Sequence, residues 1–214
     1  VSIKYQTSWP GTDPMNAQNP TQVATRVSYY GVTGVPDGEL DGGLGFSGQP
    51  AGMGQSDITN RYAVTSPFDI SVDFYLNAAK DSIFCHAHFL CTQAVSGTLV
   101  GHMAVIERNI YFTTAPGTNG EKHFEGVMKQ MLPSDQGTTL ATSWNVGDSL
   151  DLNYSWALAN VYDKNQLACV AFIQDNATKE VLQAGYMSPR IAYDAGVTAI
   201  TGNAFQCSPT ITPT

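Results

Sequence analysis

The chain has 214 residues, enough for one or two domains, and 43% of them are hydrophobic, which allows a sizeable core. Ten Lys and Arg against 18 Asp and Glu give a net charge of -8 without a basic cluster, which argues against sequence-independent nucleic-acid binding. Its apolar runs are far shorter than the roughly 20 residues of a transmembrane helix. Only 13% of residues are charged, and the ten Tyr and nine Phe indicate a β-rich fold.

Residues 1–65 are expected to follow a β-α-β-α order. The expected elements are a strand at 3–7, a helix from Asn19-Pro20 to Tyr30 ended by Gly31, a short strand after 33–36 that turns at Asp41-Gly42, and a helix at about 56–62. The chain starts directly in a strand pattern, and residues 208–214 have the composition of a Thr/Pro linker. We therefore expect a mature or processed piece of a longer protein.

From residue 68 onward the hydrophobic period changes to two. Strands are expected at 68–74, 83–91, 102–112, 150–156, 167–174 and 181–186. The spacing of Phe124, Val127, Met128 and Met131 instead predicts one short helix over 124–132, ended by Pro133. Residues 66–207 are thus predicted to form an antiparallel β-sandwich, and the fold class is β-rich α+β.

Several motifs carry a family resemblance. Residues 9–15 (WPGTDPM), 29–36 (YYGVTGVP), 127–133 (VMKQMLP) and 170–184 occur in this order. Together they resemble the 28-kilodalton outer-membrane-protein family of the Bacteroidetes. The resemblance implies a thioredoxin-like region at 1–65 followed by a β-sandwich, in a protein exported to the outer-membrane surface or beyond. Many such proteins resemble substrates of the type IX secretion system.

The sequence departs from this family at the redox motif. Members commonly begin with a strand and a Trp-Cys-x-x-Cys helix start, and this chain has no such pair. What remains resembles the later half of a thioredoxin fold, in which Val35-Pro36 matches the cis-proline loop. The resemblance therefore implies a cis peptide bond before Pro36 and a partial thioredoxin-like segment. We expect this segment to pack on the sandwich or on another chain, because it is too small to enclose a core.

Four cysteines are candidates for disulfides in an exported protein, with three possible connectivities: Cys85, Cys91, Cys169 and Cys207. Cys85 and Cys91 would lie roughly 20 Å apart on one extended strand, so their direct pairing requires the strand to end between them. Buried free thiols are the alternative for some of the four. No Cys-x-x-Cys spacing supports redox activity within the chain.

The histidines give a weak metal candidate. His86 and His88 alternate onto one face of one strand, and His102 lies on the next, so the three could bind zinc or copper. A solvated or packed pair of histidines explains the same pattern. No nucleophile motif, phosphate loop or His-Glu-x-x-His is present, so we expect neither a catalytic site nor a cofactor.

Aromatic residues could form a platform for a carbohydrate. Tyr154 and Trp156 share one face of a strand, where either ligand binding or core packing accounts for them. Asp81-Ser82-Ile83 and Asp148-Ser149-Leu150 resemble the O-glycosylation pattern of exported Bacteroidetes proteins, which makes Ser82 and Ser149 glycosylation candidates. Both serines are expected in turns where a strand begins.

The sequence therefore favours a secreted or cell-surface protein with a non-catalytic binding or assembly role. Its expected partners are another protein chain or a cell-surface component, with a glycan as a further ligand and no nucleic acid. One alternative is a thiol-disulfide oxidoreductase whose Cys-x-x-Cys lies upstream of Val1. The other is a carbohydrate-binding β-sandwich module.

Overall fold

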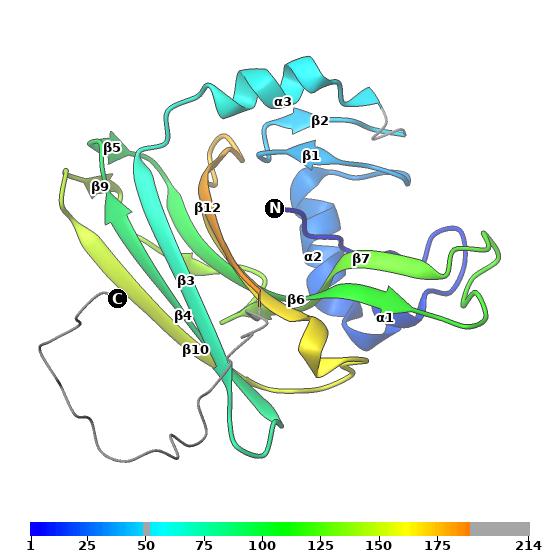
Figure 1. The fold of residues 1–214 in the computed structure, drawn as a ribbon. Coiled ribbons are helices and arrows are strands. Elements are labelled where there is room, and N and C mark those ends of the chain that lie inside the picture. The colour runs from blue at the N-terminus through cyan, green and yellow to red at the C-terminus, as the bar shows by residue number, and fades with distance from the viewer. Residues whose placement is uncertain (49–51, 189–214) are drawn as a thin grey trace, which may run out of the picture.

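The computed structural model describes residues 1–48 and 52–188, and two antiparallel sheets form the centre of the molecule (Figure 1). The smaller sheet has the order β10-β4-β3, and the larger has the order β12-β11-β6-β7 with β8 beside β6. Their strands are β3 (Phe68–Leu76), β4 (Ser82–Cys91), β6 (Leu99–Tyr111), β7 (His123–Leu132), β8 (Thr138–Thr139), β10 (Ser149–Ala157), β11 (Leu167–Asp175) and β12 (Val181–Met187). Among the described residues, no helix is long and apolar enough to cross a membrane.

Alternating side chains of the two sheets meet in the main core. On β4 the alternate residues Ile83, Cys85, Ala87 and Phe89 are buried, while those between them are at least partly exposed. They pack against inward residues of β6 and β11, such as Met103 and Ile173. Because side chains of a strand alternate between its two faces, this pattern leaves the smaller sheet with one face in the core and one in solvent.

The larger sheet is covered on both faces, because helix α2 (Pro20–Tyr30) packs on the side away from the core. The side chain of Asn19 caps the first turn of α2, and Gly31 ends the helix with a positive φ of 73°. Val23 packs with Met128 and Phe172 in a second core. This double coverage explains why β11 reads as a continuous apolar run.

The remaining elements are short or lie at the ends of the sheets. They are α1 (Pro14–Gln18), the hairpin of β1 (Glu39–Leu40) and β2 (Leu44–Gly45), α3 (Gln55–Tyr62), β5 (Val95–Ser96) paired with β9 (Ser143–Trp144), and the 3₁₀ turn η2 (Lys164–Gln166). In Figure 1, α3 and the hairpin lie together across one end of the sandwich.

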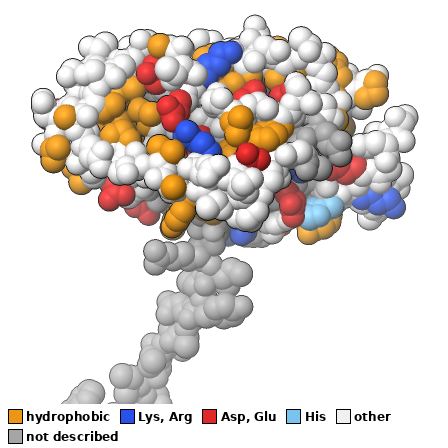
Figure 2. Space-filling view, turned by 90° about the horizontal axis from the view of Figure 1, so that it is seen from above, with side chains coloured by type: hydrophobic (Ala, Val, Ile, Leu, Met, Phe, Trp, Pro, Cys, Tyr) orange, Lys and Arg blue, Asp and Glu red, His pale blue; other side chains and the backbone are white. Residues whose placement is uncertain are grey.

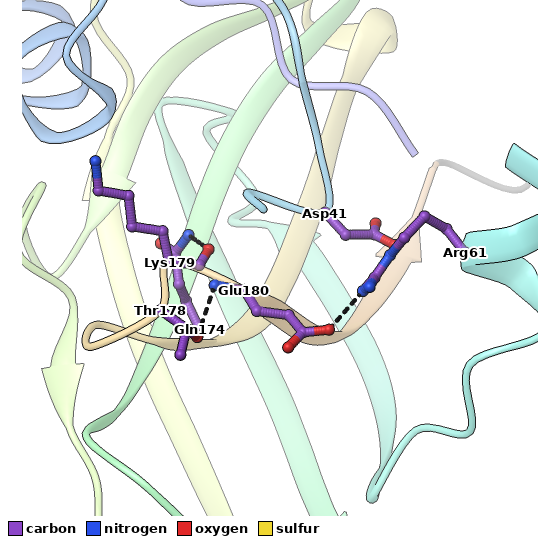
Figure 3. Close-up of polar contacts among 6 residues, drawn as sticks. All are labelled: Asp41, Arg61, Gln174, Thr178, Lys179 and Glu180. Atoms are coloured by element: carbon purple, nitrogen blue, oxygen red, sulfur yellow. Dashed lines mark hydrogen bonds and ion pairs between the residues drawn. The ribbon is translucent and has the colours of Figure 1, made fainter. Parts of the chain in front are cut away.

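Ion pairs and a backbone hydrogen bond connect the β1–β2 hairpin and α3 to the turn between β11 and β12. Arg61 of α3 bonds Asp41 through Nε at 3.0 Å and Glu180 through Nη2 at 2.8 Å (Figure 3). The backbone N–H of Val181 donates to the carbonyl of Asp41 at 2.7 Å. Gly42 has a φ of +68°, and a Cβ there would lie 2.1 Å from the carbonyl oxygen of Lys179. Only glycine allows this close approach.

Replacing Gly42 with Ala should therefore destabilise the protein by about 2 kcal/mol or more, because it adds both backbone strain and a steric clash. Gly43→Ala is the matched control, because the nearest atom to its Cβ would be 4.0 Å away. Chemical denaturation of both variants measures the effect. Equal stability of the two would show that the hairpin does not need this contact.

Several strand and helix predictions are confirmed, and two are wrong. The helices at 20–30 and near 56–62 and the six strands from residue 68 onward are present. Residues 124–132, expected as a helix, form strand β7. Residues 3–7 do not form a strand, because only Lys4 makes an isolated bridge, to Val127.

The partial thioredoxin-like arrangement is not seen in the described part of the chain. β1 and β2 form a separate antiparallel hairpin, and neither joins a sheet that α2 covers. Residues from the first 65 do pack on the sandwich, since Tyr5 and Val23 contact the second core. The peptide bond before Pro36 is cis, as are those before Pro10 and Pro133. Cys207 and the linker at 208–214 lie outside the described residues.

Candidate functional site

The outward face of the smaller sheet combines aromatic and polar side chains. It is formed by the alternate residues that point away from the core on three neighbouring strands. We call this set the outer face; its members are Asp69, Ser71, Asp73 and Tyr75 of β3, Phe84, His86, His88 and Leu90 of β4, and Ser149, Asp151, Asn153 and Ser155 of β10.

The strand register arranges these residues in rows across the sheet. Tyr75, Phe84 and Ser155 form one row, and the next is Asp73, His86 and Asn153. The rings of Tyr75 and Phe84 stack with their centroids 5.0 Å apart and an interplanar angle of 5°. Ser155 is too small to cover the other side of Phe84. A shallow cavity of about 390 Å³ lies here, lined by both rows together with Phe74, Cys85 and Tyr154.

A cluster of two histidines and one carboxylate adjoins this cavity. His86 Nε2 and His88 Nδ1 each lie 2.9 Å from the same oxygen, Oδ1 of Asp151. The hydrogen bonds that Asp151 accepts from the two histidines, the larger contribution coming from His86 and the smaller from His88, hold its pKa below the ordinary value. Within the described ranges, no group of three or more His, Cys, Asp or Glu has the arrangement of a metal site. The cluster is therefore a fixed set of donors and acceptors.

His102 does not join the other two histidines. It lies on β6 in the larger sheet, where it is buried and stacks on Phe172 with a centroid distance of 4.8 Å. Neither ring nitrogen has a hydrogen-bond partner in the part of the chain that the structure describes. The metal candidate of His86, His88 and His102 is thus not assembled by the fold.

The proposed aromatic platform lies on the wrong face of its strand. Tyr154 and Trp156 are half-buried and pack against the main core, and Tyr154 also hydrogen-bonds Thr138 Oγ1 at 2.5 Å. The polar residues between them, Asn153 and Ser155, face outward instead. The structure thus favours the core-packing alternative for this pair.

The three described cysteines are free thiols in the core. Cys85 of β4 and Cys169 of β11 are neighbours across the two sheets. The pKa of Cys169 is raised well above its ordinary value, mainly by a hydrogen bond with Cys85 and to a lesser extent by burial. The thiol of Cys91 instead donates to the carbonyl of Gln93 at 3.0 Å. Burial makes all three thiols inaccessible, and its raised pKa further makes Cys169 a poor nucleophile.

The two glycosylation candidates both lie where a strand begins, as expected. Ser82 opens β4 and donates to its neighbour Asp81 at 3.0 Å, whereas Ser149 opens β10 and is exposed. Ser149 belongs to the outer face.

The comparisons with known proteins leave the family open. No protein-family model and no curated protein matches the chain. A similar solved structure is a domain of the outer membrane lipoprotein Omp28 from Porphyromonas gingivalis, with 13% identity and a TM-score of 0.42 over 58% of this chain and 89% of that one. A β-glucosidase from Kluyveromyces marxianus has 9% identity and a TM-score of 0.27, over 57% and 14%. At these values neither likeness assigns a function.

Proposed function

We propose that the chain is a non-catalytic binding module whose outer face binds a neutral carbohydrate. The observation that carries the proposal is the exposed Phe84 ring in a cavity edged by Asp73, His86 and Asn153. An aromatic ring offers an apolar surface to the C–H face of a sugar. The adjoining polar side chains supply hydrogen bonds to its hydroxyl groups.

The charge of the outer face favours a neutral ligand over an anionic one. The face carries three carboxylates, Asp69, Asp73 and Asp151, and neither Lys nor Arg. Carboxylates accept hydrogen bonds from sugar hydroxyls, but they repel sulfated or uronic-acid glycans. Asp151 is already ionised and oriented by two histidines, so its second oxygen is available to a ligand.

The surface location belongs to the same proposal. It is supported by the motif resemblance to exported outer-membrane proteins described above. The buried thiols in the described part of the chain give no support to the oxidoreductase alternative. Binding of sugar on a sheet face requires no covalent chemistry, which fits a chain without a nucleophile motif.

Replacing Phe84 with Ala should weaken carbohydrate binding at least tenfold, which corresponds to about 1.4 kcal/mol. Binding is measured by calorimetry with neutral oligosaccharides that a glycan array selects. Tyr111→Ala is the matched control, because Tyr111 is also exposed and stacks on a neighbouring ring, His123, at 4.2 Å on the other sheet. The proposal is wrong if no neutral glycan binds, or if both variants bind like the wild type.

A further inference from the structure

Arg26 is a buried cation on the sheet-facing side of α2. Only 3% of the surface of Arg26 is exposed, although an arginine is almost never fully buried without an ion-pair partner. Arg26 Nη2 donates to the hydroxyl of Tyr30 at 2.9 Å and to Gln174 Oε1 at 3.0 Å. Its Nε is buried and has no hydrogen-bond partner among residues 1–48 and 52–188. One N–H donor of the guanidinium is therefore unsatisfied.

No carboxylate of the described residues forms an ion pair with this charge. None of the ion pairs formed among residues 1–48 and 52–188 involves Arg26. Its guanidinium carbon instead lies 4.6 Å from the ring centre of Tyr29 and 5.0 Å from that of Tyr30. Ring faces attract a cation, but they leave its N–H donors without an acceptor.

Arg26 lines a cavity of about 1,020 Å³. Tyr5, Val27, Phe172 and Val181 give it an apolar wall. Burial raises the pKa of Tyr5 to about 12, an effect that Arg26 partly offsets, so this wall stays uncharged near neutral pH. The volume is at the upper end of the range for small-ligand sites.

The same cavity has an acidic side at the hairpin. Asp37, Glu39 and Asp41 line it, and Asp41 is neutralised by Arg61 (Figure 3). Asp37 accepts a hydrogen bond from Ser47, and neither Asp37 nor Glu39 forms an ion pair within the described ranges. The pKa of Glu39 is raised, mainly by burial and also by the negative charge of the nearby Asp37. The positive charge of Lys179 offsets part of this increase. Among the described residues, Asp37 and Glu39 thus have no ion-pair partner, and Lys179 is near only Glu39.

The rest of the cavity lining adds further charges of both signs. Lys4 is its second cation, and Asp13 and Glu121 are its other carboxylates. Asp13 is engaged in capping α1, where its side chain accepts from the backbone N–H of Asn16 at 2.8 Å. Figure 2, which views the molecule from the end where α3 and the hairpin lie, shows hydrophobic side chains interspersed with acidic and basic ones.

We propose that this cavity binds a short free peptide, with its C-terminal carboxylate on Arg26 and its N-terminal ammonium facing Asp37 and Glu39. A carboxylate would accept hydrogen bonds from the guanidinium, including the donor that now lacks a partner. An ammonium would supply the charge that the acidic side lacks. The apolar wall would contact the side chains of the peptide. This site is separate from the outer face and does not depend on carbohydrate binding.

The test compares peptides that differ only at their ends, on the unmodified protein. We expect the tripeptide Val-Ala-Val to bind at least tenfold more tightly than its C-terminal amide, as measured by calorimetry at low salt. N-terminal acetylation should also weaken binding, by about threefold or more. Equal affinity for the acid and the amide, or no binding of either at millimolar concentration, would overturn the proposal.

Variants then assign the carboxylate contact to Arg26. Arg26→Met should abolish the preference for the free acid, whereas Arg108→Met should keep it. Arg108 is a suitable control because its Nη2 donates to the carbonyl of Asn165, and it does not line the cavity. If the Arg26→Met variant does not fold, the proposal is tested by the wild-type protein alone, through the difference in its affinity for the free-acid peptide and the C-terminal amide. An Arg26→Met protein that folds and still prefers the acid would contradict the assignment.

Discussion

Replacing Lys129 with Met is expected to lower the free energy of unfolding by about 3–5 kcal/mol. The side chains of Lys129 and Glu107 are 2% and 0% exposed, with Nζ and Oε2 3.4 Å apart. Glu107 Oε1 also accepts from the backbone N–H of Asp163 at 2.5 Å, whereas Oε2 makes no hydrogen bond. Methionine would fill the space but leave the Glu107 carboxylate buried without a counter-charge.

Urea denaturation at neutral pH measures this loss against two companion variants. Lys122→Met, at an exposed lysine, should change stability by less than about 0.5 kcal/mol. The double variant Lys129→Met/Glu107→Gln should recover part of the loss, because the amide removes the charge and still accepts from Asp163. A Lys129→Met protein within about 1 kcal/mol of the wild type would show that the pair is not coupled as the structure indicates.

Lowering the pH from 6.5 to 4.5 should remove about 2–3 kcal/mol of stability through His102 alone. The pKa of His102 is lowered from 6.5 to about 3, mainly by burial and to a lesser extent by the positive charge of Arg26. In this window the unfolded chain binds a proton at His102 and the folded protein does not. The stability is therefore complete above pH 6.5 and is lost progressively as the pH falls toward 3.

The variants His102→Gln and His123→Gln separate this effect from other titrations. The first removes the buried imidazole, and the second removes an exposed one on β7. Denaturation at pH 7 and pH 4.5 should show a smaller acid loss for His102→Gln and an unchanged loss for His123→Gln. An acid loss in His102→Gln as large as in the wild type would contradict the burial of a neutral imidazole.

The strands of the smaller sheet could be predicted from the sequence because one face of each is buried and the period of two is plain, and β11 could be predicted from its continuous apolar run. β7 could not, for a physical reason. Gly126 has a φ of +64°, and the register shifts between Val105 and Ile106, so the alternation is interrupted. The strand is also buried on both faces. Its apolar residues therefore fell at positions that imitate a helix.

The candidate site could be predicted only in part. Alternation within β4 placed Phe84, His86 and His88 on one face, but the partner Asp151 comes from β10 through the strand register, which the sequence does not reveal. The sequence could not decide between ligand binding and core packing for Tyr154 and Trp156, because alternation shows that two faces differ and not which one meets the second sheet. Likewise, the sequence does not reveal that Arg26 is buried without an ion pair to any carboxylate of the described residues, because this depends on how the fold packs α2 on the larger sheet.

Backbone amide chemical shifts, followed by NMR during titration with a neutral oligosaccharide, test the central claim most directly. We predict shifts that cluster at Tyr75, Phe84 and Asn153, with a saturable binding curve and no change at the residues that line the Arg26 cavity. The account would be contradicted by shifts centred elsewhere in the molecule. It would equally be contradicted by a spectrum that no neutral glycan changes.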